Sequence, residues 1–367
     1  MGRPERYSFG EVRMTLAGQT LAIPNLRPLF QHWPQNVNPA LGRLQEAVLD
    51  SLEKFALNPH HRQSLIEANV AHFTVNCWPD ADFETLNFMA NMVLWAWLIE
   101  GYTDKLSADE EAAHTLRSEA KSTWSSFLRL YNHDGAGCTG FKEPLQFPLV
   151  ASFNPIAARL CQVFDRVLAG YRAIIEVPST ECRQLLLDEL FTYLDGTELE
   201  AKMRRSGQMP PYDRYLSMRA SANGSGFFLL VSGLHKLAAA GHTALGKSTR
   251  WMELKKIAAT INFLVNDLLS AKKEFETDEY LNSIILRAYD LGSVDASVAE
   301  CVARVKGLVQ EFDHQAQTIL ADTPQVDNAH SSVAGAIEAM RSFNVGSLEW
   351  RQAAHPPKQT FRLASWD

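Results

Sequence analysis

Apolar residues along the chain recur at steps of three and four, which is the period of an amphipathic helix. Runs that alternate with a period of two, as strands do, are almost absent. Clusters of Pro, Gly, Asn and Asp separate the periodic segments, for example at 78–80 and 209–211. The pattern predicts an all-α fold of roughly ten or more helices. The longest expected helices are 40–56, 84–99, 107–130, 155–175, 181–203, 226–240, 250–276, 279–291 and 294–321.

No feature of the sequence marks a boundary between domains. It contains no internal repeat, no low-complexity block and no Gly/Ser-rich linker. The polar stretch 132–147 is long enough to be an insertion in the helical pattern. A length of 367 residues is compatible with one large domain or two. We therefore interpret residues 1–367 as a single α-helical domain.

Composition and charge exclude several classes of protein. The net charge of −7 argues against a nucleic-acid partner, because a phosphate backbone selects basic surfaces. Residues 1–6 contain no apolar signal region, and the longest apolar run, 88–99, is shorter than the ~20 residues that span a bilayer. Five scattered cysteines without a CxxC pair are typical of reduced thiols. The sequence thus predicts a cytoplasmic protein with no membrane span.

The segment 266–274, Asn-Asp-Leu-Leu-Ser-Ala-Lys-Lys-Glu, is the most informative part of the chain. Asn266, Ser270 and Glu274 are four residues apart, so on a helix they lie on one face, about a turn apart. An amide oxygen, a hydroxyl and a carboxylate form an all-oxygen set, which suits a hard cation such as Mg²⁺. Protein-bound Mg²⁺ usually shares its ligands with water and a phosphate-bearing substrate. The segment therefore indicates metal-assisted chemistry on a diphosphate.

An ordinary solvated helix face is the alternative interpretation of this segment. Asp267, Lys272 and Lys273 would fit such a face. The preceding run 257–265 is strongly apolar, which favours a polar stripe on a buried helix instead. Spacing alone leaves both interpretations open.

Two carboxylates that follow the apolar run 88–99 form a second candidate. Glu100 and Asp104 are four residues apart, again on one helical face. Acidic residues are common at helix ends, so this pair alone does not identify a metal site. Opposite the segment 266–274 in a helical bundle, it would complete a cleft for several Mg²⁺ ions and a diphosphate.

The third candidate combines an arginine with small residues. Arg219 precedes the run 220–226, Ala-Ser-Ala-Asn-Gly-Ser-Gly. Small residues allow close approach of a ligand to the backbone, and they interrupt a helix. A guanidinium here could bind phosphate oxygens in a bidentate manner, although an ordinary surface arginine is the alternative.

In their order along the chain, 100–104, 219 and 266–274, the three elements resemble those of a class I terpene synthase of the microbial type. Segment 266–274 matches the family's metal-binding motif NDxxSxxKE at every defined position. Residues 100–104, Glu-Gly-Tyr-Thr-Asp, match its aspartate-rich motif in part, because Gly101 stands where a second acid is expected. Arg219 matches the diphosphate-sensor arginine, and Asn223 and Gly224 lie near the position of the effector glycine.

The resemblance implies a helical bundle around a central cavity, with 1–35 packed over the active site and 345–367 as a C-terminal segment. Three Mg²⁺ ions, or Mn²⁺ as an alternative, would be bound by Glu100, Asp104, Asn266, Ser270 and Glu274. The family's C-terminal Arg-Tyr pair is absent, and Arg362 or Arg351 would take the place of its arginine. The expected diphosphate-binding residues are therefore Arg219, Lys273, Arg362 and Arg351.

A carbocation needs a dry cavity, and aromatic faces stabilise its charge. Candidate wall residues, each of which would also suit ordinary core packing, are Phe73, Phe88, Trp95, Phe228, Phe263 and Trp350. The implied activity is ionisation of an isoprenyl diphosphate, with farnesyl diphosphate as the first choice. Cyclisation to a sesquiterpene, expected as a hydrocarbon, and release of diphosphate would follow.

Two alternatives and the oligomeric state stay open at the level of sequence. An isoprenyl diphosphate synthase shares the helical bundle, but it would carry two DDxxD motifs, which this sequence lacks. A helical binding or scaffold protein that has lost catalysis is supported by the incomplete acidic motif and the missing tyrosine. Such a scaffold would show no metal-dependent stabilisation. Both a monomer and a homodimer are compatible with the sequence.

Overall fold

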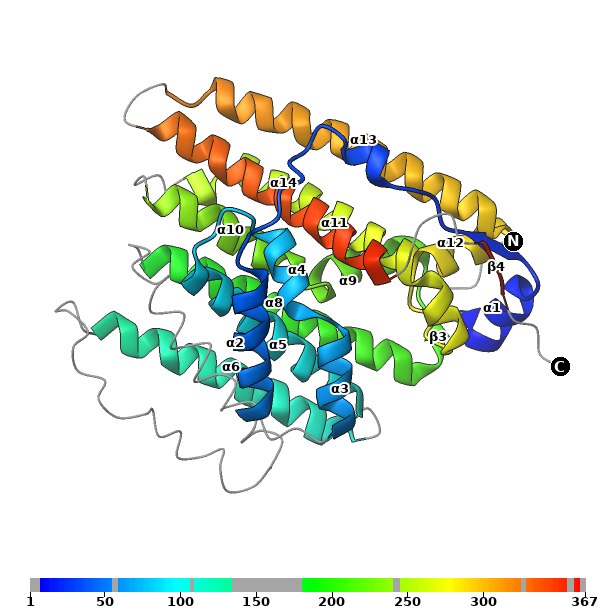
Figure 1. Ribbon diagram of the computed structural model, residues 1–367. Helices are drawn as coiled ribbons and strands as arrows, with labels where there is room; N and C mark the ends of the chain where they lie inside the picture. Colours follow the sequence, from blue (N-terminus) through cyan, green and yellow to red (C-terminus); the bar gives the residue numbers. More distant parts are fainter. Residues whose placement is uncertain are drawn as a thin grey trace. The chain divides into compact units, whose positions relative to one another are not determined.

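The computed structural model describes residues 7–54, 59–105, 109–133, 180–239, 245–324, 328–354 and 360–363. Helices dominate these ranges, as the sequence predicts (Figure 1). The chain forms two compact units, Met1–Gln35 with Thr192–Asp367, and Asn36–Phe191. The predicted helix 155–175 and nearly all of the predicted insertion 132–147 lie outside the described residues. The single-domain interpretation stays a prediction.

The unit Asn36–Phe191 is organised around helix α5 (Phe83–Lys105). Helices α2 (Leu41–Lys54), α4 (Val70–Cys77) and α6 (Glu110–His133) each contact α5, and α3 (Pro59–Glu67) precedes α4. Most side chains of α5 between Leu86 and Ile99 are buried, because its apolar residues surround the whole helix. The helix continues to Lys105, so the acidic segment 100–104 forms its C-terminal end.

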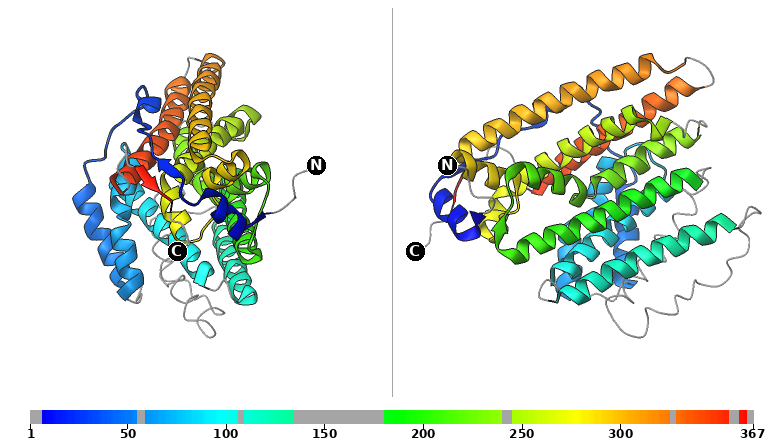
Figure 2. Two further views of the ribbon diagram at one scale, coloured as in Figure 1. Left: turned by 90° about the vertical axis from the view of Figure 1, so that its right-hand side faces the viewer. Right: turned by 180° about the vertical axis from the view of Figure 1, so that it is seen from behind.

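The other unit is organised around helix α11 (Thr249–Glu276). Helices α9 (Tyr212–Ala222), α10 (Ser225–Ala239), α12 (Ser283–Leu291), α13 (Val294–Ala321) and α14 (Ala329–Ala354) all contact α11. Figure 2 shows α11 among these helices from two further sides. Ser248 caps the start of α11 by accepting a hydrogen bond from the backbone N–H of Trp251 at 3.2 Å. Neighbours on several sides explain why nearly all of the residues 257–265 of α11 are buried.

Segments from both ends of the sequence form short strand pairs in this unit. Strand β1 (Tyr7–Ser8) pairs with β3 (Gln208–Met209), and β2 (Thr20–Ala22) pairs with β4 (Thr360–Arg362), both antiparallel. Helix α1 (Phe9–Leu16) contacts α12, and the 3₁₀ helix η1 (Arg27–Phe30) contacts α13. Helix α8 (Thr180–Ser206) precedes β3, and η3 (Leu245–Lys247) precedes α11. Sequence periodicity predicts none of the strands, since each has only two or three residues.

Helix α14 lies in a part of the chain for which the periodicity predicts no long helix. Its apolar residues are interspersed with Ala, Ser, Gly and Asn, which weakens the periodic signal. In the structure Val333, Ile337, Met340 and Leu348 are buried. The expected boundary at 345 therefore lies within a continuous helix.

Within the described ranges, no helix has the length and hydropathy needed to cross a bilayer. Cys77 and Cys301 are buried, as expected of small apolar side chains. The side chains of the other three cysteines lie outside the described residues.

The crossing of α8 and α9 depends on Gly196. A Cβ at this position would lie 2.6 Å from the Ala222 nitrogen and 2.7 Å from the Ser221 carbonyl carbon, and both are backbone atoms. We expect Gly196→Ala to lower the free energy of unfolding by about 1–3 kcal/mol through overpacking. Gly307→Ala in α13 is the matched control, because no described atom lies within 4 Å of its added Cβ and alanine favours a helix. Urea unfolding of both variants checks this, and equal stabilities would contradict it.

Candidate metal and diphosphate site

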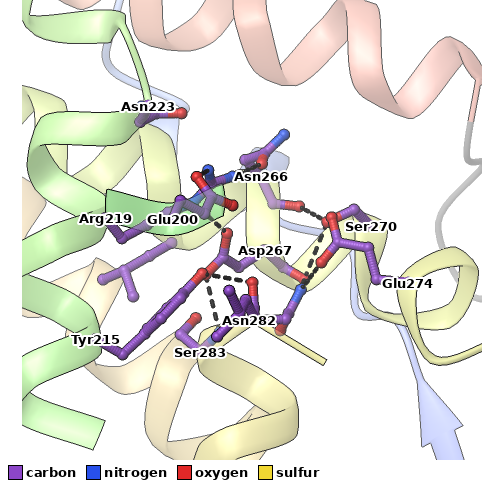
Figure 3. A network of polar contacts seen from close by, with 12 residues as sticks. Glu200, Tyr215, Arg219, Asn223, Asn266, Asp267, Ser270, Glu274, Asn282 and Ser283 are labelled. Atoms are coloured by element: carbon purple, nitrogen blue, oxygen red, sulfur yellow. Dashed lines mark hydrogen bonds and ion pairs between the residues drawn. The ribbon is translucent and has the colours of Figure 1, made fainter. Parts of the chain in front are cut away.

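The predicted metal-binding stripe lies on α11. Asn266, Ser270 and Glu274 are all half-buried and lie along the same helix, as Figure 3 shows. The Ser270 hydroxyl donates to the Asn266 carbonyl oxygen at 2.9 Å, so its lone pairs stay available as ligands. The three side chains therefore present an amide, a hydroxyl and a carboxylate oxygen at adjacent turns.

Arg219, in the last turn of α9, reaches this stripe. Its Nη2 donates to Asn266 Oδ1 at 2.8 Å, and its Nε donates to Asp267 Oδ1 at 3.1 Å. Its Nη1 lies 3.4 Å from Glu200 Oε2 on α8. Burial opposes the charge of Arg219, but Tyr215, Asp267 and Glu200 together raise its pKa well above the usual value. The guanidinium is therefore held as a fixed cation beside a candidate metal ligand.

Asp267 does not lie on a solvated helix face, which was the alternative interpretation of the segment, because it is fully buried. Its Oδ2 accepts hydrogen bonds from the Tyr215 hydroxyl at 2.8 Å and the Ser283 backbone N–H at 2.9 Å. With Arg219 on Oδ1, three donors surround one carboxylate (Figure 3). Successive residues on a helix point about 100° apart, so Asp267 faces α9 and α12 while Asn266 belongs to the stripe.

Asn282 connects the end of the stripe to helix α12. Its Nδ2 donates to the Asp267 carbonyl oxygen at 2.7 Å and to Glu274 Oε2 at 2.8 Å. Its Oδ1 accepts from the Ile284 backbone N–H at 2.8 Å and caps α12. Burial, together with repulsion from Asp267, raises the pKa of Glu274 to about 7, although Arg219, Asn282 and a Ser270 hydrogen bond oppose the shift. A cation bound beside Glu274 would lower this pKa.

These residues fit a divalent cation such as Mg²⁺. The donor set consists of oxygen atoms only, and the one carboxylate in it is half-buried, where a cation would stabilise its charged form. Among the described residues, no group of three or more His, Cys, Asp or Glu side chains could hold a metal ion. That finding is compatible with the stripe, because only one of its three candidate ligands is a carboxylate.

We expect the pH dependence of stability to report on Glu274. Its pKa is about 7 in the fold against 4.5 as the ordinary value, so the folded state retains a proton that the unfolded chain has lost. Its contribution to stability is therefore present at acidic pH and declines as the pH rises from about 5 to 8. In EDTA, the melting temperature of the wild type should fall relative to Glu274→Gln over this range. Saturating Mg²⁺ should reverse the trend, and parallel curves would contradict the prediction.

The small-residue run 220–226 interrupts the helix, as predicted. Helix α9 ends at Ala222 and α10 begins at Ser225, with Gly224 between them at φ +69°. An added Cβ at Gly224 would also lie 3.2 Å from the Tyr193 ring, so both conformation and space favour glycine. Asn223 Nδ2 donates to Ser225 Oγ at 2.7 Å and lies 3.3 Å from Asn262 Oδ1 on α11.

The other candidate diphosphate-binding residues have different surroundings. Lys273 is exposed on α11. Arg351 donates to the Ser347 hydroxyl, and its Cζ lies 5.7 Å from the Trp350 ring centroid. Arg362 is exposed on strand β4. Their diphosphate roles stay predictions.

The acidic pair lies in the other compact unit. Glu100 is half-buried on α5, whereas the side chain of Asp104 lies outside the described residues. Their role as an opposite wall of the metal site therefore stays a prediction.

The predicted wall aromatics all occur on helices. Phe73, Phe88, Trp95 and Phe263 are buried, while Phe228 and Trp350 are half-buried. Trp95 packs edge to face on Trp124, with ring centroids 5.8 Å apart, and Phe228 stacks on Phe343 at 6.2 Å. These contacts fit core packing, and a role in lining a cavity stays a prediction.

Sequence reasoning missed five contributors to the network, namely Glu200, Tyr215, Asp267, Asn282 and Ser283. Tyr215 carries a signal, because it is four residues before Arg219 and thus on the same face of α9. Asn282 precedes the apolar run 284–286, which is typical of a helix N-cap. For Glu200 we find no signal in the sequence.

The family model for terpene synthase family 2, C-terminal metal binding, matches residues 91–312. The chain belongs to this family. The matched range contains Glu100, Arg219 and the whole segment 266–274. This match confirms the predicted terpene synthase activity and its class I assignment. The solved structures described below confirm the predicted all-α fold.

Individual relatives and solved structures agree with this family. The sesquiterpene cyclase hepA of Aspergillus oryzae is 23% identical over 88% of this chain and 86% of its own length. The terpene cyclase braA of Annulohypoxylon truncatum is 21% identical over 83% of this chain and 76% of its own length. The crystal structure of linalool/nerolidol synthase from Streptomyces clavuligerus has a TM-score of 0.68 at 16% identity, covering 87% of this chain and 98% of that one.

Proposed function

We propose that this class I terpene synthase ionises farnesyl diphosphate in a divalent-metal-dependent reaction, cyclises the carbocation to a sesquiterpene and releases diphosphate. The observation that supports it most strongly is the contact of Arg219 with the Asn266 stripe, at 2.8 Å from Nη2 to Oδ1. A fixed cation and three oxygen ligands then lie together, as binding of a diphosphate with its metal ions requires. The name of the relative hepA, a sesquiterpene cyclase, supports the choice of a C15 substrate.

The residues act mainly through electrostatics. Asn266, Ser270 and Glu274 would hold Mg²⁺, with Mn²⁺ as an alternative ion, and Glu100 and Asp104 would bind further ions for a total of three. When bound, the ions act as Lewis acids toward the leaving diphosphate. Arg219 needs no reorganisation to donate hydrogen bonds as negative charge develops, because Asp267 and Glu200 already fix its guanidinium.

The incomplete acidic motif at 100–104 predicts how a substitution of Gly101 changes the response to Mg²⁺. Among the residues that the structure describes, no atom lies within 4 Å of a Cβ added there, which leaves room for a larger side chain on α5. Gly101→Asp supplies the acid that the family motif contains, and we expect its turnover at low Mg²⁺ to equal or exceed that of the wild type by up to about tenfold. Gly101→Asn is the matched control without the charge and should show no gain. Lower turnover of the Asp variant at every Mg²⁺ concentration would contradict this role of 100–104.

The experiment for the proposed function compares C10, C15 and C20 isoprenyl diphosphates with and without Mg²⁺. Diphosphate release and volatile products are measured together. We expect Mg²⁺-dependent release with farnesyl diphosphate and a cyclic C15 product. If no substrate released diphosphate and Mg²⁺ left the melting temperature unchanged, the scaffold alternative would be favoured. A longer isoprenyl diphosphate as product would favour the chain-elongating alternative.

A further inference from the structure

Asn262 continues the metal-binding stripe by one turn in the N-terminal direction of α11. It is four residues before Asn266, so it lies on the same face, about 6 Å away along the helix axis. The residue is only 3% exposed. The adjacent turn of the helix is apolar, with Ala258 and Ala259 buried. Asn262 thus places one amide among apolar residues, directly beside the candidate metal ligands.

This amide is only half satisfied by hydrogen bonds. Its Oδ1 lies 3.3 Å from Asn223 Nδ2, whereas its own Nδ2 has no hydrogen-bond partner within the described part of the chain. Turning the Asn262 amide would place its Nδ2 against the Asn223 Nδ2, which is also a donor, so neither end would then be paired. A buried polar group without a partner costs about 1–3 kcal/mol, and folded proteins usually satisfy such groups with an ordered water.

Asn223 provides the other side of the same small polar group. It lies at the α9–α10 interruption, half-buried, and donates to Ser225 Oγ at 2.7 Å. Figure 3 shows Asn223 on the same side of the network as Arg219 and Asn266. Asn223, Ser225 and Asn262 therefore form a polar corner, which we call the amide corner, next to the stripe.

We propose that the amide corner holds one water molecule and that this water captures the carbocation, so that the product is a terpene alcohol. The inference rests on the proposed function and replaces the hydrocarbon expected from the family resemblance. Asn262 is a positioning residue: its Nδ2 donates to the water oxygen, which keeps a lone pair for the cation. Being neutral, the amide neither adds to the cation nor removes a proton.

The step balances without a further reactant. The carbon–oxygen bond to diphosphate breaks, and the water oxygen supplies the electron pair for a new carbon–oxygen bond. The resulting oxonium loses one proton to the released diphosphate. The net reaction converts the diphosphate ester and water into an alcohol and diphosphate.

The test uses the full-length protein with farnesyl diphosphate and Mg²⁺ in ¹⁸O-labelled water. We expect an alcohol as the main product of the wild type, with ¹⁸O on carbon and no product when EDTA is present. Phosphatase cleavage would put the label on phosphate instead. Asn262→Leu removes the donor at similar volume, so the ratio of alcohol to hydrocarbon should fall at least about tenfold while diphosphate release continues. Thr260→Val, on the same helix, is the matched control and should retain the wild-type ratio.

The possible results distinguish failure of the water site from failure of the proposed function. Diphosphate release with only hydrocarbon products would overturn the water site and leave the proposed function intact. An alcohol whose yield is equal in the wild type and Asn262→Leu would also overturn it, because bulk water would then be the source. No release of diphosphate from any isoprenyl diphosphate would overturn both. Should Asn262→Leu fail to fold, the wild-type product and its label still decide whether an alcohol forms.

Discussion

Glu274→Gln is expected to reduce metal-dependent diphosphate release strongly and to leave the fold intact. Glutamine keeps the size of the side chain and an acceptor for the Asn282 amide, which lies 2.8 Å from Glu274 Oε2. It lacks the negative charge that a hard cation prefers in a ligand. We expect kcat/KM for farnesyl diphosphate to fall by at least about a hundredfold. Because the pKa of Glu274 is about 7, a neutral side chain should not destabilise the metal-free protein at neutral pH.

The matched control for this variant is Glu276→Gln, two residues further along α11. The side chain of Glu276 is 48% exposed, and its Oε1 lies 3.6 Å from Lys272 Nζ. An exposed pair of this kind contributes little, so we expect wild-type turnover and Mg²⁺ response. The measurement is diphosphate release against Mg²⁺ concentration, with melting temperature as a second readout of metal binding. Wild-type release by Glu274→Gln would refute the metal role of the stripe.

The segment 266–274 was predictable because its evidence is local. Three ligand-type side chains at four-residue spacing define a face of a helix before any partner is known. The same is true of the interruption at Gly224, since small residues act on the backbone where they stand. Both expectations agree with the structure: α11 carries the stripe, and α9 ends before Gly224.

The supporting network was not predictable in the same way, because its contacts join residues that are distant in sequence. Asp267 is charged and adjacent to Asn266, so composition favours a surface position. Its burial becomes favourable only when α9 supplies Tyr215 and Arg219 and α12 supplies the Ser283 N–H. Periodicity reports which face of a helix is apolar, but not which charges a neighbouring helix will neutralise.

The strands were missed for a related reason. Strand β2 pairs with β4 through Thr20–Arg362, Leu21–Phe361 and Ala22–Thr360, so each strand is defined by the opposite end of the chain. Three residues carry too little alternation to be recognised alone. The predicted diphosphate-binding role of Arg362 depends on this strand pair. The pair fixes the backbone of Arg362, while the side chain is exposed.

Asp267→Asn is expected to cause the largest loss of stability among single substitutions in the network. Asp267 is fully buried and directly bonded to Arg219, which is itself 14% exposed. Removing one charge of a buried pair costs about 3–5 kcal/mol, because the remaining charge stays out of water without compensation. Glu200, at 3.4 Å from Arg219 Nη1, already shares its charge with Arg204, so it compensates only in part. The asparagine NH2 group would also face either the Tyr215 hydroxyl and the Ser283 N–H or, in the other orientation, Arg219 Nε, and all three of these groups donate in the wild type.

The comparison with Glu300→Gln separates burial from the mere presence of an ion pair. Glu300 contacts Arg287 through Nε and Nη2 at 2.9 Å each, so its geometry is at least as good as that of Asp267 with Arg219. The side chains of Arg287 and Glu300 are 29% and 42% exposed, however, and a solvated pair contributes only about 0–1 kcal/mol. Urea unfolding should therefore rank Asp267→Asn several kcal/mol below Glu300→Gln. If the two variants were equally stable, Asp267 would not be what holds Arg219 against the stripe, and the pre-organisation of the diphosphate site would need another source.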